Sequence, residues 1–340
     1  MKNCKVGILY NRPLDSGTDF SEASVDVMTQ VDAVEHALAK LGYPSARIPF
    51  TKDAVAVSSE IGEERADIYV NLCESVDEDP LLIGHPAAVL ELLGLPFTGS
   101  SSLALMLTTD KVMSKRVLAG GGIRTPAYAF FDGRERPNLA PLRFPVIVKP
   151  RFQDASIGIE QDSVFQDEAR LREQIDILYQ RYGPLLIEEY ISGREFNISL
   201  LGYPDPSGLP IAEIDFAEYP PGLHRIVGYR AKWDSSSFEY HHSPRVFPQL
   251  PPPLNEHLKE VALACFHLFM LRDYARVDVR VDDRGEVYVL EINANPCISP
   301  DAGFPAAAYR HGLTYTDLIQ RLLRFAEQRK TYGFDTPART

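Results

Sequence analysis

The stretch of sequence that decides the fold runs from Arg276 to Pro296 and reads RVDVRVDDRGEVYVLEINANP. Before Gly285, valines alternate with charged residues, and a second apolar run follows the glycine. Side chains along a strand point alternately to its two faces, and glycine favours a turn. The stretch therefore predicts a half-buried β-hairpin whose charged residues gather on one side.

The register of this hairpin follows from the position of its turn. With the turn centred on residues 283–284, Arg276 lies opposite Glu291 and Asp278 lies opposite Val289. Asp278 and Glu291 are then diagonal neighbours, about 7–8 Å apart or closer. The other face would carry Val277, Val279, Val281, Tyr288, Leu290 and Ile292.

The charged face has the chemistry of a phosphate and metal site. Mg²⁺ prefers one or two carboxylates together with phosphate oxygens of a substrate, and Asp278 and Glu291 supply such a pair. Arg276 beside them could neutralise charge that develops on a phosphate in a transition state. A hairpin with a merely solvated charged face is the structural alternative. Asn293 and segment 294–296 argue against it, because a solvated face does not need two amides and a proline at the strand end.

Outward from the hairpin, the chain alternates between strand and helix patterns. The expected strands are Val6–Tyr10, Ile68–Cys73, Phe144–Pro150, Leu185–Ile191, Glu195–Leu201 and Ile211–Phe216. The expected helices are Val25–Leu41, Pro86–Leu93, Lys111–Ala119, Leu254–Leu271 and Thr316–Ala326. Gly42 and Gly94 end the first two helices. The βαβ-like order at the start of the chain predicts a small parallel sheet covered by helices.

Composition argues against several classes of protein. The 340 residues suffice for two or three packed units, and 45% apolar with 24% charged residues is usual for globular proteins. A net charge of −12 argues against nucleic acid or an anionic membrane as partner. No apolar run approaches the ~20 residues of a membrane span, and the start of the sequence does not look like a secretory signal. Four scattered cysteines suggest neither a disulfide framework nor a zinc site, so a cytoplasmic enzyme is expected.

Arg276–Pro296 resembles the metal-binding hairpin of ATP-grasp enzymes. Five other stretches resemble the D-alanine–D-alanine ligases of that superfamily, in the same order. They are Asp110-Lys111, Phe144–Pro150, Gln153–Gly158, Leu186–Glu195 and Tyr229–Trp233. No Walker A or G-x-G-x-x-G fingerprint competes with them. The resemblance implies an ATP-grasp fold, α/β with α+β subdomains.

The resemblance also implies a three-domain ligase. Residues 1–105 would form an N-terminal Rossmann-like preATP-grasp domain, and residues 106–195 the central lid subdomain of the ATP-grasp fold. Residues 196–330 would form the C-terminal ATP-grasp domain with the metal site, and residues 331–340 a tail.

Each matching residue acquires an implied role. Asp278, Glu291 and Asn293 would bind Mg²⁺, as one or two ions for which Mn²⁺ can substitute. Arg276 and Lys232 are the implied catalytic residues, because they would contact phosphate. The implied ATP contacts are Lys111, Lys149, Ser156, Glu188, Ile191, Glu195 and Lys232. Within that set, Glu188 and the Ile191 backbone would hold the adenine, and Glu195 the ribose hydroxyls.

The implied reaction is ATP- and Mg²⁺-dependent amide formation. ATP would phosphorylate a substrate carboxylate, and an amine would then attack the acylphosphate. This chemistry needs no protein nucleophile, so Cys73 and Cys297 are expected to be packing residues.

The sequence departs from the ligases around the expected substrate site. Trp233 replaces a tyrosine whose hydroxyl helps to close the flap over the phosphates, and Cys297 replaces a glycine near the tetrahedral intermediate. A serine that would hold the carboxylate of the second substrate is not clearly matched. Candidate substrate contacts are Glu22, Glu74, Ser299 and Asp301. The structural alternative is that they are only loop and cap residues. The hypothesis is a ligase that has kept ATP and metal but has changed its donor or acceptor.

Three alternatives stay open from the sequence. One is a true D-alanine–D-alanine ligase with divergent loops, and another is a kinase-like ATP-grasp protein without an amine acceptor. The third is a non-catalytic nucleotide-binding module. The expected partners are small molecules, an amino acid or related carboxylate plus an amine, and the resemblance makes a homodimer the easy guess.

Overall fold

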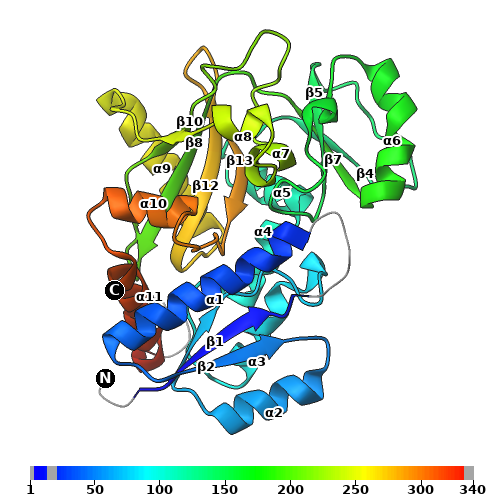
Figure 1. Ribbon diagram of the computed structural model, residues 1–340. Helices are drawn as coiled ribbons and strands as arrows, with labels where there is room; N and C mark the ends of the chain where they lie inside the picture. Colours follow the sequence, from blue (N-terminus) through cyan, green and yellow to red (C-terminus); the bar gives the residue numbers. More distant parts are fainter. Residues whose placement is uncertain (1–3, 14–20, 333–340) are drawn as a thin grey trace.

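A computed structural model describes residues 4–13 and 21–332. Its strands form three separate sheets, and Figure 1 shows the N-terminal sheet lowest, the C-terminal sheet above it and the middle sheet at the upper right. The predicted mixed α/β class is confirmed by this arrangement. In the described residues, no helix combines the length and the apolar character needed to cross a membrane.

The N-terminal sheet is parallel, with strand order β2-β1-β3. Its elements are β1 (Val6–Asn11), α1 (Ser21–Leu41), β2 (Ser45–Phe50), α2 (Ala54–Glu64), β3 (Ile68–Asn71), a 3₁₀ turn (Pro80–Leu82) and α3 (Gly84–Leu92). The predicted first strand and long helix are confirmed, and Gly42 follows the helix in the left-handed region, at φ +78°. The pair β2 and α2 was not predicted, because Arg47 and Pro49 interrupt the apolar pattern of the strand.

The middle sheet is antiparallel, with strand order β4-β7-β5-β6. Its elements are β4 (Tyr128–Phe131), β5 (Val146–Pro150), a 3₁₀ turn (Gln161–Ser163), β6 (Val164–Phe165), α6 (Glu168–Tyr182) and β7 (Leu185–Glu189). Leu171 and Ile175 of α6 are buried against Val148 and Ile187 of the sheet. This unit therefore has a small core of its own.

The C-terminal sheet has the strand order β11-β10-β8-β12-β13, and β9 pairs with β8. The strands are β8 (Arg194–Gly202), β9 (Ser207–Gly208), β10 (Ala212–Ile214), β11 (Arg245–Val246), β12 (Asp273–Val281) and β13 (Val287–Asn293). The helices of this half are α7 (Tyr229–Trp233), α8 (Phe238–His242), α9 (Pro252–Leu268), α10 (Gly303–Arg310) and α11 (Tyr315–Tyr332).

Two earlier helices share the core of the C-terminal sheet. They are α4 (Ser102–Thr109) and α5 (Lys111–Gly120). Leu105 and Leu118 of these helices are buried in the same cluster as Phe266 of α9 and Val289 of β13. The core therefore crosses the domain boundary expected at residue 105, and the domain limits stay a prediction.

The predicted β12–β13 hairpin forms, but the predicted register is wrong. Asp278 pairs directly with Glu291 and Arg276 with Asn293, and the register shifts between Asp278 and Val279. Val279 pairs with Val289, which leaves Leu290 as an extra residue in β13. Such a bulge adds one unpaired residue and changes the alternation of faces. Of the three predicted partners of the valine face, only Ile292 is buried, while Tyr288 and Leu290 are partly exposed.

Candidate active site

One cavity of about 530 Å³ is lined by residues from α1, from the middle sheet and from the C-terminal sheet. The predicted site residues that line it are Glu74, Lys149, Ser156, Glu188, Ile191, Glu195, Lys232, Arg276, Asp278, Glu291, Asn293, Ser299 and Asp301. Lys111 lies beside it, with its ammonium group 3.1 Å from Glu291. The side chain of Glu22 falls outside the described side chains.

The carboxylate pair sits on the bulged hairpin. Asp278 and Glu291 face each other across β12 and β13. Arg276 donates to both carboxylate oxygens of Asp278, from Nε to Oδ1 at 2.8 Å and from a terminal nitrogen to Oδ2 at 2.9 Å. The amide of Asn197 donates to Oδ1 at 2.7 Å. Burial alone would lower the pKa of Arg276, but Asp278 holds that pKa above its usual range.

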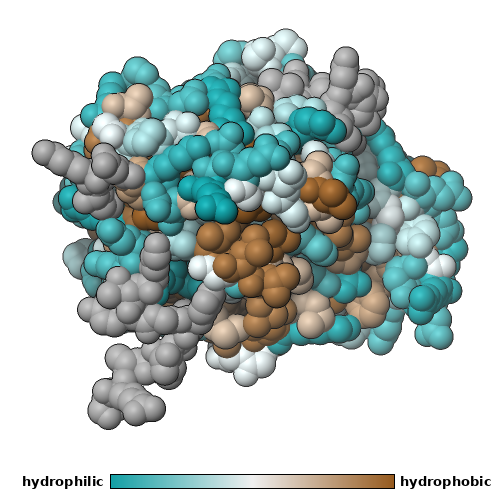
Figure 2. Space-filling view, turned by 90° about the horizontal axis from the view of Figure 1, so that it is seen from below, coloured by the Kyte–Doolittle hydropathy of each residue, from teal (hydrophilic) through white to brown (hydrophobic). Residues whose placement is uncertain are grey.

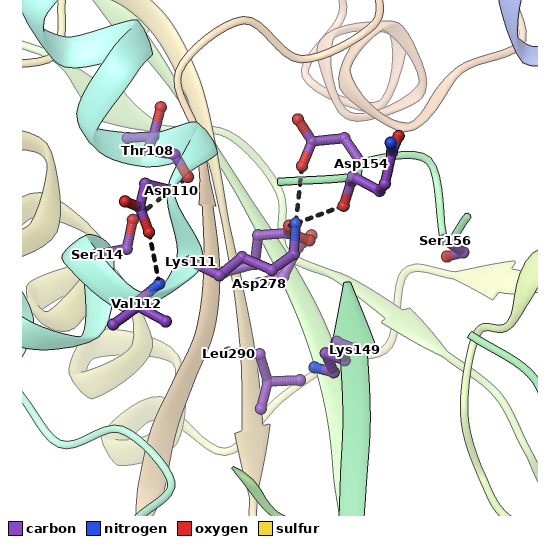
Figure 3. Close-up of polar contacts among 12 residues, drawn as sticks. Thr108, Asp110, Lys111, Val112, Ser114, Lys149, Asp154, Ser156, Asp278 and Leu290 are labelled. Carbon is purple, nitrogen blue, oxygen red and sulfur yellow. Dashed lines mark hydrogen bonds and ion pairs between the residues drawn. The ribbon is translucent and has the colours of Figure 1, made fainter. Parts of the chain in front are cut away.

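Lys111 joins this pair to the loop of residues 153–158, which we call the flap. Asp110 caps α5 by accepting from the N–H groups of residues 112 and 113, and this fixes Lys111 at the start of the helix. Figure 3 shows the Lys111 ammonium group pointing toward Asp154, to which it donates at 3.0 Å. It also donates to the Gln153 carbonyl at 2.6 Å. Burial would lower the pKa of Lys111, but Asp154 and Glu291 raise it.

A buried ion-pair triad lies behind Glu291. Glu188 of β7 is 1% exposed, and its Oε1 lies 2.5 Å from Lys149 Nζ. Its Oε2 lies 2.7 Å from the Nζ of Lys115, which is also buried. Burial would raise the pKa of Glu188, but the two ammonium groups lower it. Both oxygens of Glu188 thus contact ammonium groups, so its predicted contact with adenine stays a prediction.

Arg280 holds the segment between β7 and β8. Its guanidinium donates to Glu195 Oε2 from Nε at 3.2 Å and from a terminal nitrogen at 2.8 Å. It also donates to the Ile191 carbonyl at 2.8 Å and to the Arg225 carbonyl. Arg280 follows Asp278 by two residues on β12, so the predicted ribose contact Glu195 and the carboxylate pair are fixed by one strand.

The flap is fastened to the α7 region by two hydrogen bonds. Ser156 Oγ donates to the Val227 carbonyl at 2.7 Å. The indole N–H of Trp233 donates to the Ala155 carbonyl at 3.0 Å. The residue that replaces the tyrosine therefore still contacts the flap, because its indole supplies a donor in place of the hydroxyl. Lys232 lines the cavity beside it, and desolvation together with nearby Arg276 lowers the pKa of Lys232.

Known proteins are similar to this chain in sequence and in fold. The sequence model of the family described as "D-ala D-ala ligase C-terminus" matches residues 121–324. A D-alanine–D-alanine ligase of Carboxydothermus hydrogenoformans is 33% identical over 315 residues, which cover 89% of this chain and 94% of that ligase. The protein y4sG of Sinorhizobium fredii is 34% identical over 261 residues, 76% of this chain and 74% of y4sG. The ATP complex of D-alanine–D-alanine ligase from Bacillus anthracis superposes with a TM-score of 0.77, covering 97% of this chain and 99% of that one, at 24% identity.

The chain belongs to the D-alanine–D-alanine ligase family. It is an ATP-dependent carboxylate–amine ligase that forms a peptide-type bond. The predicted ATP-grasp fold and the predicted class of ligase are both confirmed.

Beyond the predicted nucleotide contacts, the cavity of this ligase has an acidic wall that reaches α1 and the end of β3. Glu74 follows β3, and burial raises its pKa to about 7. Gln30 of α1 donates to Glu74 at 2.9 Å, which opposes that rise. Asp26 of α1 lines the same cavity, as do Asp154 and Asp301. A cationic or amine-bearing substrate group would complement this wall.

Cys297 and Ser299 both face Asp26. Ser299 Oγ donates to Asp26 Oδ1 at 2.9 Å, and the Cys297 thiol donates to Oδ2 at 3.1 Å. Cys73 is fully buried, as expected for a packing residue, whereas Cys297 lines the cavity. The expectation for Cys297 is corrected accordingly. Burial and the acidic neighbours Glu74 and Asp26 raise the pKa of its thiol.

Sequence reasoning missed several residues of the site. Lys115 had one usable signal, since a spacing of four residues puts it on the same helix face as Lys111. Asp154 stands in the resembling stretch Gln153–Gly158, whereas Asp26 and Arg245 had no signal, because only tertiary packing brings them to the cavity.

Proposed function

We propose that this ligase uses ATP together with Mg²⁺ to activate a substrate carboxylate as an acylphosphate, which an amine then attacks. The observation that carries the proposal is the direct pairing of Asp278 with Glu291 inside a cavity that also holds Arg276 and Lys232. Oxygen ligands and nearby cations are what phosphoryl transfer requires.

The donor set fits Mg²⁺. Asp278 and Glu291 offer carboxylate oxygens, and Asn293 offers an amide oxygen from the same face of the hairpin. In the described residues, no group of three or more His, Cys, Asp or Glu side chains is arranged to hold an ion alone. Two carboxylates completed by phosphate oxygens match the preference of Mg²⁺, for one ion or two, and Mn²⁺ has similar ligand preferences. Such an ion would supply positive charge to the phosphates.

Each of the predicted site residues then has a role in binding ATP or in phosphoryl transfer. Lys111 and Lys149 bind phosphate oxygens as point charges, and Ser156 together with the flap backbone covers them. Arg276 and Lys232 balance the charge that moves onto the transferring phosphate. Glu188, Ile191 and Glu195 hold the nucleoside, with Arg280 fixing the last two. Because Arg276 and Lys111 now contact the two carboxylates, they must exchange some of these contacts when phosphates bind.

The acidic wall supports a proposal for the substrate class. Glu74 and Asp301 are proposed to bind the amine of an amine-bearing substrate. Ser299 is proposed to contribute indirectly, by orienting Asp26 through its hydrogen bond to that carboxylate. An amino acid is the simplest molecule that supplies both a carboxylate and such an amine. D-alanine is the second candidate, because the named relatives are D-alanine–D-alanine ligases. The side chain of Glu22 keeps its predicted substrate role as a proposal.

We further propose that the chain is a cytoplasmic homodimer. A reaction that consumes ATP suits the cytoplasm. Figure 2 shows hydrophobic residues gathered near the middle of one face. Exposed apolar side chains on α3 and α4 include Leu92, Leu103 and Met106. Exposed apolar patches of this kind mark protein interfaces, and size-exclusion chromatography with light scattering tests the dimer.

The ligase proposal is tested by measuring ADP release from ATP and Mg²⁺ with pairs of D- and L-amino acids and small amines. Release that depends on a particular pair, with an amide of the expected mass, supports the proposal and names the substrates. A stable phosphorylated product without an amide would instead indicate a kinase. Nucleotide binding with no turnover by any pair would indicate a binding module.

A further inference from the structure

Lys115 of α5 is a buried lysine to which the proposed nucleotide and metal chemistry gives no role. It lies one turn after Lys111, on the same face of the helix. Its side chain is 1% exposed, and Nζ lies 2.7 Å from Glu188 Oε2. Burying a charge costs free energy unless the charge is paired and hydrogen-bonded. The remaining contacts of the ammonium group therefore indicate what its burial serves.

These remaining contacts run to the bulge in β13. Lys115 Nζ donates to the Leu290 carbonyl at 3.0 Å and to the Val289 carbonyl at 3.4 Å. It also donates to Thr125 Oγ1 at 2.7 Å, and that hydroxyl donates to the Val289 carbonyl at 2.8 Å. Leu290 is the extra residue of the bulge, which the neighbouring strand leaves unpaired. Lys115 supplies the donor for its carbonyl.

The outer side of β13 depends on such contacts. Within the part of the chain that the structure describes, β13 is an edge strand, with β12 as its one neighbouring strand. An edge leaves backbone groups without ladder partners. At the bulge, the Val289 N–H donates to the Arg124 carbonyl at 2.9 Å, beside the contacts of Lys115 and Thr125. This side of the strand is therefore covered where its register changes.

The bulge decides where Glu291 points. On the side of the turn, Val279 pairs with Val289. If β13 continued from there without the bulge, Leu290 would lie opposite Asp278. A slip of one residue turns a side chain to the other face of the sheet, so Glu291 would then point away from Asp278. The extra residue instead puts the two carboxylates directly opposite each other.

Helix α5 thus holds two consecutive residues of β13. Lys111 Nζ lies 3.1 Å from the Glu291 carboxylate, and Lys115 donates to the Leu290 carbonyl. The first contact must be exchanged in part when phosphates bind. The second is enclosed in the protein and would hold the backbone that carries Glu291 in place.

We propose that Lys115 is a positioning residue that holds the β13 bulge, and with it the direct opposition of Asp278 and Glu291 on which metal binding depends. The inference rests on the proposed Mg²⁺-dependent function. Lys115 itself touches neither metal nor nucleotide. Because Glu188 contacts both Lys115 and Lys149, the same network joins the bulge to the predicted phosphate contact Lys149.

Binding of the non-hydrolysable ATP analogue AMP-PNP, with and without Mn²⁺, tests this. Calorimetry on the full chain, well below its unfolding midpoint, gives two affinities. Their ratio reports what the metal adds, because a change in the nucleotide contacts alone affects both. Lys115→Met keeps the length of the side chain and removes the ammonium group. Losing a residue that orients metal ligands typically costs about 10–100-fold in metal affinity, so the ratio should fall by that factor. An unchanged ratio overturns the inference.

Ser114→Ala is the matched control for a merely structural role. Ser114 is the neighbouring buried residue of α5, and its hydroxyl donates to the carbonyls of Leu107 and Thr108 instead of β13. Both variants should lower the thermal unfolding midpoint, but only Lys115→Met should lower the ratio. Lys115→Gln keeps a neutral donor and should restore part of it. An equal fall of the ratio in Ser114→Ala would overturn the inference.

The ion pair with Glu188 is separated from the bulge contact by a second variant. Glu188→Gln keeps the ammonium group at the bulge, so the ratio should fall less than in Lys115→Met. An equal fall would assign the effect to the ion pair and overturn the inference. If Lys115→Met does not fold, Lys115→Met/Glu188→Gln replaces it, compared with Glu188→Gln, because this double variant leaves no buried carboxylate without its lysine.

Hydrogen exchange without nucleotide or metal keeps this test separate from the Mg²⁺ proposal. Mass spectrometry of peptides that cover residues 287–293 should show faster amide exchange in Lys115→Met than in Ser114→Ala. If Mn²⁺ adds nothing to binding by the original chain, the metal proposal fails, and exchange in β13 alone decides whether Lys115 holds the bulge. Equal exchange in the two variants would overturn the inference.

Discussion

Asp278 supports the site in two ways at once. It is a proposed metal ligand, and it fixes the guanidinium of Arg276 through two hydrogen bonds. Asp278→Asn keeps the shape of the side chain but removes its charge, so it weakens both metal binding and the contact that fixes Arg276. We expect kcat to fall by about 10²–10³-fold, measured by ADP release. Asp176→Asn, at a surface ion pair, is the matched control, and a loss of only a few fold in Asp278→Asn would contradict the role.

Glu74 is predicted to make stability depend on pH. Its pKa is raised from 4.5 to about 7, mainly by burial, with Asp26 and Asp154 adding to the rise and Lys232 opposing it. The folded state therefore holds a proton that the unfolded state releases between these pH values. Stability must then fall as pH rises from 4.5 to 7. Because the side chain of Glu74 is partly exposed, we expect the free energy of unfolding to fall by only about 1–3 kcal/mol over this pH range.

Denaturant unfolding below pH 4.5 and above pH 7 measures this dependence. In Glu74→Gln, stability should fall less between pH 4.5 and pH 7, because glutamine does not titrate. Parallel curves for the two proteins across the whole range would show that Glu74 titrates normally.

At the scale of elements, one of the hydrogen bonds that hold the flap comes from an indole. Trp233→Phe keeps the ring but removes the N–H that donates to Ala155. One hydrogen bond is worth about 1 kcal/mol net, so we expect about fivefold weaker coupling between the flap and α7. The flap should then admit water to the acylphosphate. The ratio of ADP released to amide formed should rise above one, and a ratio that stays at one would mean that other contacts close the flap.

The hairpin shows what sequence can and cannot predict about an element. Alternation of valine and charge predicts strands, faces and the chemistry of Asp278 and Glu291, because these depend on neighbours in sequence. The bulge at Leu290 is not encoded in that pattern, since the run from Val287 to Ile292 is apolar apart from Glu291. The turn shifts the pairing by one residue from the predicted register and the bulge shifts it by one more, and together they change the pair from diagonal to direct.

At the scale of the whole molecule, α11 fastens the C-terminal half to the N-terminal sheet. Leu318, Leu322 and other residues of α11 are buried with Val6 and Ile8 of β1. Arg329 donates to both carboxylate oxygens of fully buried Asp273, which also accepts from the Gly99 N–H at 2.8 Å. This contact joins the last helix to the start of β12.

Arg329→Ala should therefore destabilise the fold without touching the cavity. Removing one partner of a buried ion pair costs about 3–5 kcal/mol, and Asp273 would be left without its arginine. The thermal unfolding midpoint should fall clearly, while kcat at low temperature stays close to that of the original chain. Arg324→Ala, an exposed position of the same helix, is the control. Equal midpoints for the two variants would contradict the role of the contact between Arg329 and Asp273.

The same long-range contacts mark the limit of sequence reasoning for the site. Lys149, Glu195 and Asn293 stand in stretches that match a known pattern, so their presence in one cavity followed from the resemblance. Asp26 and Arg245 stand in no such stretch. Asp26 reaches the cavity because α1 packs against a segment far away in the sequence, where Asp26 contacts Ser299, 273 residues later. Arg245 reaches it from β11, at the edge of the C-terminal sheet opposite the hairpin.

The central claim is that a carboxylate is activated by transfer of the terminal phosphate of ATP. A donor amino acid labelled with ¹⁸O in its carboxylate tests this most directly, with the released phosphate analysed by mass spectrometry. The carboxylate oxygen attacks phosphorus, and the bond from the acyl carbon to that oxygen breaks when the amine attacks. The account predicts one ¹⁸O atom in each phosphate released with an amide. Unlabelled phosphate, with the amide still formed, would contradict it.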